Sequence, residues 1–390
     1  MPDPGSGGLR EVAGTFLRLG LTAFGGPAGH IAIMRDEFVR RRGWLEDPAF
    51  VDLIGAANLI PGPTSTELAM HIGHRRAGRA GLVVAGLAFL LPSVLIMAVL
   101  AWLYVEHGRR PEVAALLAGI TPIVVAIVAH AGWSIARTTL RSRIQVVLLV
   151  AAVGAIVTGV PEIAVLLGGG VLAVGRSALR PHGPTVGLAG WAGPPIASSA
   201  GTTAAAGAIA TVATVATPGI VFVTFLKIGA VLFGSGYVLV ALLRSELVDG
   251  LGWITETQLL DAVAAGQATP GPLFSTATFI GYLVGGPAGA IAATFGVFLP
   301  AFVAVALSIP LLARLRTSVR ARAFLDGVNS AALGLLGVVA VQLALAGVRD
   351  ALGVATLIAA FLLLLRGVGT GRLIAAGAAI GLIRGLLPPG

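Results

Sequence analysis

Two Pro-Gly-Pro tripeptides, each followed by hydroxyl side chains, have the residue types and spacing best suited to binding chemistry. Pro61-Gly62-Pro63 precedes Thr64-Ser65-Thr66, and Pro270-Gly271-Pro272 precedes Ser275-Thr276. Proline is tolerated in a first helical turn and glycine allows close backbone approach, so each tripeptide predicts a helix start. Free amides at a helix N-terminus, together with hydroxyl groups, suit a tetrahedral oxyanion. The alternative is that these hydroxyls only cap a buried helix.

Two glycine-rich interruptions of apolar segments form a second candidate site. They are Phe24-Gly25-Gly26-Pro27, with His30 one turn later, and the stretch from Phe233 through Gly234, Ser235 and Gly236. His30 could supply a positive charge or a proton, or it could be a structural residue of an apolar helix. A donor ring could be completed by the amides of Asn58 and Gln267, which precede the two tripeptides; otherwise they satisfy unwound backbone.

Two cations lie within apolar segments, at Arg18 and Lys227. An ionisable residue inside a membrane segment is a functional hypothesis, so we expect Lys227 to contact substrate and Arg18 to act in coupling or gating. Both side chains could instead extend to a membrane interface.

Five further charged residues are candidates for gating or proton coupling. Arg35 with Glu37, and Arg244 with Glu246, are predicted to form symmetric ion pairs beside the interruptions. Glu67, which has no acidic counterpart after the second tripeptide, is a candidate proton-coupling carboxylate, or else a polar contact within its hairpin.

An internal repeat organises all of these residues. When the chain is shifted by 209 residues against itself, 17 of the 49 positions from 15 to 63 are identical. Phe24-Gly25 then falls on Phe233-Gly234, and Gly43-Trp44 falls on Gly252-Trp253. We therefore expect two homologous domains, residues 10–180 and 218–387, joined by a linker at 181–217.

The composition predicts an integral membrane protein. Hydrophobic residues make up 56% of the 390 positions and charged residues 11%, about half the charged content of an average soluble domain. The net charge of +9 is spread between apolar segments, which argues against nucleic-acid binding.

Each half predicts the same order of elements. A broken helix (10–40 and 218–249) is followed by two segments of about 12 residues, which are too short to cross a bilayer. Separated by the tripeptide, they indicate a re-entrant helical hairpin. These hairpin segments are 48–59 with 64–76, and 257–268 with 273–284, and the longer apolar runs are 79–105, 113–136, 144–158, 161–178, 287–313, 320–347, 351–366 and 371–387.

The arginines predict that the two halves have opposite orientations. In the first half they flank the hairpin, at Arg40-Arg41-Arg42 and Arg75-Arg76, whereas in the second half they gather one span later, around Arg320 and Arg322. Positive residues mark the cytoplasmic side of short loops. The prediction is an all-α inverted repeat with about ten transmembrane helices and two re-entrant hairpins, and with its site at the repeat interface.

An enzyme is not expected. Cysteine is absent, and the sequence has no Walker A motif and no Gly-x-Ser-x-Gly elbow. No cofactor, metal site or nucleotide-driven pump is predicted, so any pumping must use an ion or substrate gradient, or a partner protein. The sequence leaves open whether the protein forms a homodimer.

In these motifs the chain resembles the chromate ion transporter family in its long two-domain form. The matching stretches run from Phe24 to His30, from Pro61 to Thr66, and from Gly266 to Gly281-Tyr282, and the resemblance covers about residues 10–387. It implies a multi-pass inner-membrane protein that exports chromate, coupled to an ion gradient, with sulfate as a structural mimic. Sulfate or another small anion as the cargo, and a channel-like facilitator, remain alternatives.

Overall fold

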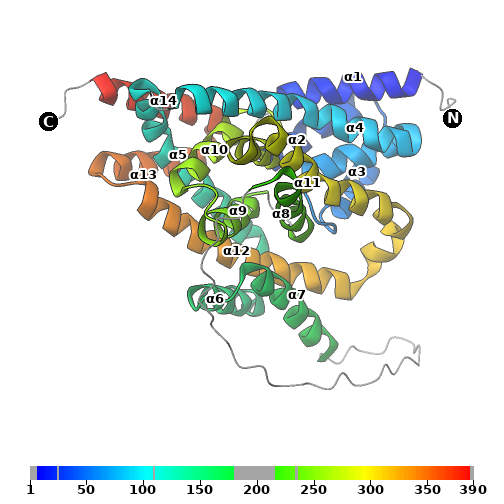
Figure 1. The fold of residues 1–390 in the computed structure, drawn as a ribbon. Coiled ribbons are helices and arrows are strands. Elements are labelled where there is room, and N and C mark those ends of the chain that lie inside the picture. Colours follow the sequence, from blue (N-terminus) through cyan, green and yellow to red (C-terminus); the bar gives the residue numbers. More distant parts are fainter. Residues whose placement is uncertain (1–6, 24–25, 109, 180–215, 233–235, 387–390) are drawn as a thin grey trace.

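The computed structural model describes residues 7–23, 26–108, 110–179, 216–232 and 236–386 (Figure 1). Within these ranges every regular element is a helix. The predictions for Phe24, Gly25, Gly234 and Ser235, and for most of the linker, lie outside the described residues. The side chain of Pro27 does so as well.

The helices of the first half follow the predicted order. A broken first helix precedes a short helix and then four longer ones, with a single turn of π-helix (η1) before the short helix. The elements are α1 (Gly7–Thr22), α2 (Gly26–Arg35), η1 (Asp36–Arg41), α3 (Asp47–Ala57), α4 (Thr64–His107), α5 (Pro111–Thr139), α6 (Arg143–Val157) and α7 (Glu162–Leu179).

The second half repeats this order, including the π-helical turn. The elements are α8 (Pro218–Val231), α9 (Val238–Leu243), η2 (Arg244–Gly250), α10 (Glu256–Ala268), the 3-10 turn η3 (Leu273–Ser275), α11 (Thr276–Thr317), α12 (Val319–Gly347), α13 (Ala351–Leu365) and α14 (Thr370–Leu386).

Equivalent kinks interrupt α4 and α11. Gly78 has φ 61° and ψ −152°, and Gly286 has φ 60° and ψ −153°. This region of backbone space is essentially restricted to glycine. Each kink separates a short initial segment after the tripeptide from a long apolar segment, so both helices bend at the same place.

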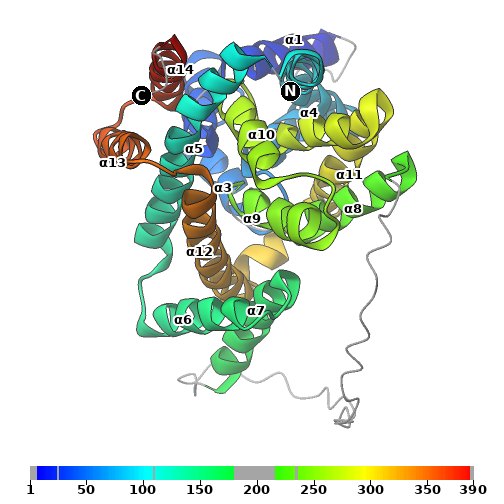
Figure 2. The same ribbon diagram turned by 60° about the vertical axis from the view of Figure 1, so that its left-hand side comes forward.

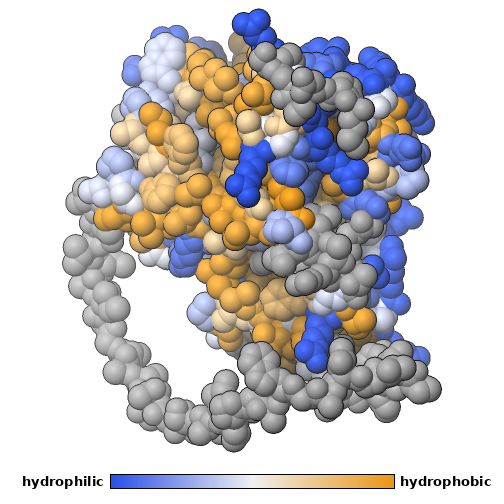
Figure 3. Space-filling model, turned by 90° about the vertical axis from the view of Figure 1, so that its right-hand side faces the viewer, coloured by the Kyte–Doolittle hydropathy of each residue, from blue (hydrophilic) through white to orange (hydrophobic). Residues whose placement is uncertain are grey.

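Four helices of the described chain are long and apolar enough to cross a membrane: Thr64–His107, Pro111–Thr139, Leu273–Pro310 and Val319–Gly347. Large apolar side chains such as Val150, Phe295 and Leu345 are exposed. On the face in Figure 3, hydrophobic side chains cover a broad central area and hydrophilic ones follow its upper and right margins. This surface is that of a membrane protein. The helices α6 and α13 have 15 residues each, about 22 Å, and are shorter than the roughly 30 Å of hydrocarbon.

The long helices α5 and α12 pack against each other in opposite directions. A Cβ placed on Gly347 would lie 2.6 Å from Cγ2 of Thr121, and one on Gly132 would lie 3.6 Å from Leu336. The contact position therefore advances along α5 as it retreats along α12. Figure 2 shows the two helices side by side, with α13 and α14 towards one end and α6 and α7 at the other.

The last helices of each half pack on the other half. The helix α14 lies on α5, where a Cβ on Gly119 would be 2.2 Å from the carbonyl oxygen of Gly377. In the equivalent contact α7 lies on α12, and a Cβ on Gly327 would be 2.1 Å from the carbonyl oxygen of Gly169. Only glycine permits such close helix crossings. The two halves thus interlock rather than sit side by side.

Candidate functional site at the interface of the two halves

Each Pro-Gly-Pro tip hydrogen-bonds to the interrupted helix of the other half. The amide of Gly62 donates to the carbonyl of Leu232 at 2.8 Å, and the amide of Gly271 donates to the carbonyl of Ala23 at 2.9 Å. Ala23 and Leu232 are the last described residues before the two glycine-rich interruptions. Each tip therefore contacts the other half at the described residue that precedes an interruption, and residues of both tips line one cavity.

His30 joins the same junction. It is buried, and its Nε2 lies 3.1 Å from the carbonyl oxygen of Ala23, the oxygen that also accepts from Gly271. A carbonyl oxygen only accepts, so Nε2 carries the proton. The Nδ1 atom has no partner among the described residues. It becomes a donor only when the ring takes up a second proton.

A small cavity lies beside this junction and is lined by both halves. Its volume is about 30 Å³, room for roughly two water molecules. A tetrahedral oxyanion has five heavy atoms, so the cavity must widen to admit one. The lining residues are His30, Pro63, Thr64, Ser65, Gly236, Tyr237, Gly266, Gln267, Thr269, Gly271, Pro272, Leu273, Phe274 and Thr370.

Two kinds of hydrogen-bond donor face this cavity. The helix α4 begins at Thr64 with no side-chain cap, and the amides of Thr66 and Glu67 bond back to the Pro63 carbonyl. Those two amides are therefore used within the first turn. The amides that precede them belong to Thr64 and Ser65, which line the cavity at the positive end of the helix dipole. The second donor is Gln267: its Nε2 is buried without a partner among the described residues, while the side chain shares a hydrogen bond with Tyr237.

Several predicted site residues lie in the tips without lining the cavity. The hydroxyl of Ser275 donates to the Pro272 carbonyl at 2.9 Å, which occupies it within its own turn. The Asn58 side chain is exposed, and its oxygen accepts a long hydrogen bond of 3.4 Å from Thr64. The other predicted residues away from the lining are Pro61, Gly62, Thr66, Pro270 and Thr276.

Glu67 lies directly behind the first tip. Its side chain is fully buried, and neither carboxyl oxygen has a hydrogen-bond partner among the described residues. A Cβ placed on Gly62 would lie 2.5 Å from Oε1, so the carboxyl group touches the tip backbone. The equivalent residue of the second half is Thr276, whose hydroxyl is also buried and has no hydrogen-bond partner in the described part of the chain.

The predicted pairing of Arg35 with Glu37 is wrong. Glu37 instead binds Arg18, and it also accepts from Nε of Arg42 at 2.6 Å. Arg35 forms a two-pronged pair with Asp47, at 2.8 and 2.5 Å. The physical reason is that side chains two positions apart on a helix point to different faces.

The predicted pairing of Arg244 with Glu246 is wrong for the same reason. Glu246 accepts from Nζ of Lys227 at 2.6 Å, and Arg244 binds Asp249 and Glu256. The Arg18–Glu37 and Lys227–Glu246 pairs occupy equivalent positions of the two halves. The Lys227 side chain is half exposed and is absent from the cavity lining, so the structure places it outside this cavity.

The structure also adds residues that the sequence did not single out. Tyr237, Thr269 and Phe274 line the cavity beside the second tip, and Thr370 reaches it from the first residue of α14. Their closeness to the motifs was the available signal for the first three. Nothing in the sequence indicated Thr370, because α14 follows the second tip by almost 100 residues.

Comparison with known proteins gives one consistent family. The chromate transporter family model matches residues 10–174 and 219–382. A chromate transport protein of Pseudomonas aeruginosa is 35% identical over 86% of this chain and 80% of its own length. A probable chromate transport protein of Synechococcus elongatus is 30% identical over 88% and 86%, and a chromate transport protein of Cupriavidus metallidurans is 30% identical over 88% and 84%. No solved structure matches.

Proposed function

The chain belongs to the chromate transporter family, and from that premise we propose that it is a secondary transporter that exports chromate across the inner membrane. Its relatives are named as transport proteins, which points to a transporter rather than an enzyme. We further propose that an ion gradient drives export, and that the anion binds where the two halves meet.

The observation that carries this proposal is the reciprocal hydrogen bonding of the tips. Gly62 of the first half donates to Leu232 of the second, and Gly271 donates to Ala23. Any movement of one half against the other must alter both contacts and the cavity between them. A substrate bound here would therefore be coupled directly to the relative position of the halves.

We place this site in an inverted repeat of about ten spans, with α3 and α10 each forming a re-entrant hairpin with the helix that follows its tip. The opposite directions of α5 and α12, and the matched backbone angles at Gly78 and Gly286, support this arrangement. In it, the two tips reach the middle of the membrane from opposite sides.

Recognition of chromate would use donors rather than a full positive charge. The first amides of α4 and the free Nε2 of Gln267 face the cavity, and a second proton on His30 would add a donor at Nδ1. Hydrogen bonds from neutral donors to a dianion are charge-assisted and strong. Because the cavity holds only about two waters, the proposal requires that it opens to load substrate.

In this proposal, Glu67 takes up and releases the proton that is coupled to transport. Its carboxyl group is buried behind the Gly62 tip with no cation paired to it among the described residues. Such a group can release a proton when the tip moves and water enters, and can take one up when the tip closes. The cycle would then link one protonation of Glu67 to each opening of the first tip.

Chromate uptake into proteoliposomes holding the purified protein tests the proposal. We expect uptake that depends on an imposed pH gradient and is inhibited by sulfate. Uptake that does not depend on the gradient would indicate a facilitator. A sulfate flux faster than the chromate flux would indicate that sulfate is the cargo. Absence of flux from correctly folded protein would contradict chromate transport.

A further inference from the structure

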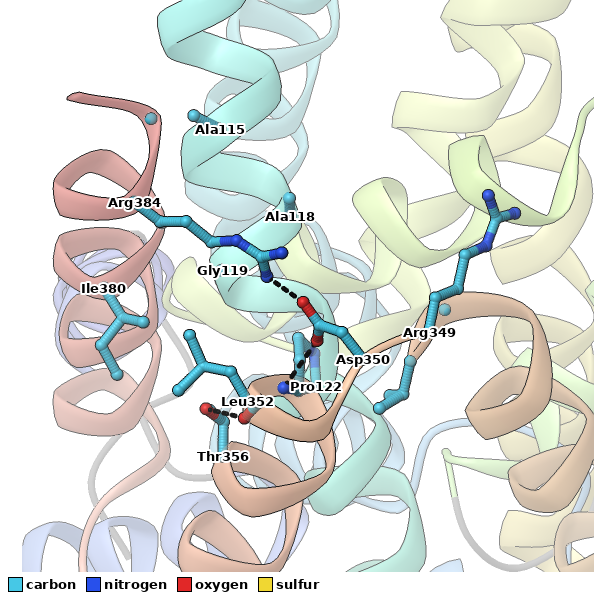
Figure 4. Close-up of a pocket in the computed structure, with 15 residues that line it drawn as sticks. Ala115, Ala118, Gly119, Pro122, Arg349, Asp350, Leu352, Thr356, Ile380 and Arg384 are labelled. Atoms are coloured by element: carbon cyan, nitrogen blue, oxygen red, sulfur yellow. Dashed lines mark hydrogen bonds and ion pairs between the residues drawn. The ribbon is translucent and has the colours of Figure 1, made fainter. Parts of the chain in front are cut away.

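A groove of about 470 Å³ lies far from the junction of the tips, where the start of α5 meets the end of α12 and the helices α13 and α14. Ala115 and Gly119 form its floor on α5, and Leu352 and Ile380 contribute exposed apolar side chains. Figure 4 shows Arg384 of α14 and Asp350 at the start of α13 pointing towards each other across it, while the Arg349 side chain points away from the pair. The groove thus has apolar walls and a charged rim.

A second groove of about 330 Å³ occupies the equivalent place in the other half. With an offset of 208 residues, its Ala323 and Gly327 correspond to Ala115 and Gly119, and Arg176 corresponds to Arg384. Because equivalent residues line both grooves, we regard the two grooves as the same kind of site, present once in each half.

The two grooves lie at opposite ends of the crossed helices α5 and α12. The first contains the start of α5 and Gly347 at the end of α12, whereas the second contains Val319 at the start of α12 and Ser142, just beyond the end of α5. Both helices are apolar and of membrane-spanning length. If the two helices cross a bilayer, the two grooves are therefore expected near the headgroups of opposite leaflets.

Both rims carry more positive than negative charge. In the first groove, Arg384 pairs with Asp350, but Arg349 forms no ion pair with a carboxylate of the described residues; its Nε donates to the Ala346 carbonyl at 3.3 Å. In the second, the lining holds one acidic residue, Asp326, and one basic residue, Arg176, and the positive charges of Arg141 and Arg322 act on Asp326 from nearby. Arg141 is the equivalent of Arg349.

We propose that each groove binds one phospholipid, whose phosphate contacts the arginine of the last helix of that half (Arg384 or Arg176) and whose acyl chains lie on the apolar wall, while Arg349 and Arg141 add positive charge nearby. Arginine suits this role because its guanidinium is a forked donor for phosphate oxygens. Basic pockets between transmembrane helices are known to hold anionic headgroups. The excess positive charge predicts a preference for an anionic phospholipid over a zwitterionic one.

Native mass spectrometry of the detergent-purified protein, with phosphatidylglycerol added, tests this directly. We expect two tightly retained lipids on the wild type. The double variant Arg349→Gln/Arg384→Gln should lose one of them, and Arg141→Gln/Arg176→Gln should lose the other, each by weakening binding roughly tenfold or more. Arg372→Gln is the matched control, because Arg372 is exposed on α14 but does not line the groove.

Two results would overturn the proposal. One is retention of both lipids by both double variants. The other is displacement of phosphatidylglycerol by inorganic phosphate, which would show a free-anion site and not a lipid site. Circular dichroism and gel filtration of every variant establish that a lost lipid does not reflect an unfolded protein.

A variant that binds phosphatidylglycerol more tightly distinguishes phosphate binding by the arginines from a general loss of structure. Asp350 accepts from the amide of Gly353 at 2.8 Å and so caps α13, and asparagine preserves such a cap. Asp350→Asn removes the negative charge beside Arg384, and we expect roughly fivefold tighter binding of phosphatidylglycerol. Unchanged or weaker binding by this variant, with α13 intact, would contradict a phosphate on the arginines.

Discussion

The hydrogen-bond donors around the central cavity differ in whether they already have an acceptor. The hydroxyl of Ser275 is committed to the Pro272 carbonyl, whereas Nε2 of Gln267 has no partner among the described residues. A buried donor without a partner is costly, unless a ligand supplies the acceptor. The structure therefore directs the search for substrate contacts to Gln267 and not to Ser275. The Thr276 hydroxyl also has no partner among the described residues, but Thr276 does not line the cavity.

Replacing Gln267 should weaken chromate binding selectively. Gln267→Leu removes the free donor, and loss of one hydrogen bond to a charged ligand predicts a roughly 10- to 100-fold higher Kd. Titration calorimetry on the detergent-purified protein measures it. Asn58→Leu is the matched control, since Asn58 holds the equivalent position but is exposed and does not line the cavity, and its hydrogen bond from Thr64 is long at 3.4 Å. Equal effects of both substitutions would remove Gln267 from the site.

Glu67→Gln should separate coupling from substrate movement. Glutamine keeps the shape and the burial of the side chain but cannot exchange a proton. We expect chromate exchange across proteoliposomes without a gradient to continue, while stimulation of uptake by a pH gradient disappears. Glu106→Gln, an exposed position on the same helix, should retain the stimulation. A Glu67→Gln protein that still responds to the gradient would show that another group carries the proton.

The ion pairs show which contacts of individual residues could not be predicted from the sequence. The repeat correctly marked Glu37 and Glu246 as equivalent, and both do lie in ion pairs. Their partners Arg18 and Lys227 come from a preceding helix, 19 residues earlier in the chain. Glu37 also binds Arg42, five positions later, beside the π-helical turn η1, in which each turn holds an extra residue. No spacing rule for ordinary helices anticipates that contact.

For the helices, the sequence predicted most of the boundaries because apolar runs end at charged or helix-breaking residues. The predicted run 351–366 is α13 (Ala351–Leu365), and 113–136 lies within α5 (Pro111–Thr139). The packing partners of these helices could not be predicted in the same way. Two homologous apolar helices expose nearly the same surface, so a sequence does not reveal whether α7 packs on α5 or, as observed, on α12.

The tips depend on the absence of side chains at their glycines. At Gly271 the φ angle is 102°, and an added Cβ would lie 2.7 Å from Cβ of Ser93 on α4 of the other half. We therefore expect Gly271→Ala to lower the free energy of unfolding, through backbone strain of about 1–3 kcal/mol and through the clash. It should also displace the tip and reduce chromate uptake.

Two further variants separate these causes. Gly78→Ala adds strain at φ 61° where no atom lies within 4 Å, so it should destabilise the protein without a clash. Ser93→Gly combined with Gly271→Ala removes the clashing Cβ and should restore part of the uptake. Thermal unfolding and chromate uptake are measured on the same variants. If the double variant is no more stable and no more active than Gly271→Ala alone, the contact between the tip and Ser93 of the other half is contradicted.

The interlocked halves give the protein its overall organisation. Helices α5 and α12 cross in opposite directions, α14 and α7 are exchanged between the halves, and the tips hydrogen-bond across the same interface. One half therefore cannot move without changing the packing of the other's last helices. Transport by such a protein would be a tilt of interlocked halves about the central cavity, with the two peripheral grooves holding lipid at either face.

This organisation makes a testable statement about sidedness. Arg141 and Arg349 are equivalent and exposed, and each follows one of the antiparallel helices α5 and α12, so an inverted repeat puts them on opposite sides of the membrane. The chain has no cysteine, so Arg141→Cys and Arg349→Cys each create a unique thiol in an otherwise unreactive protein. From the arginine distribution we expect Arg141 on the cytoplasmic side. A membrane-impermeant maleimide should therefore label Arg349→Cys in intact cells and Arg141→Cys only after permeabilisation. Labelling of both from one side would mean that α5 and α12 do not cross the bilayer in opposite directions, and both the inverted repeat and the assignment of one groove to each leaflet would fail together.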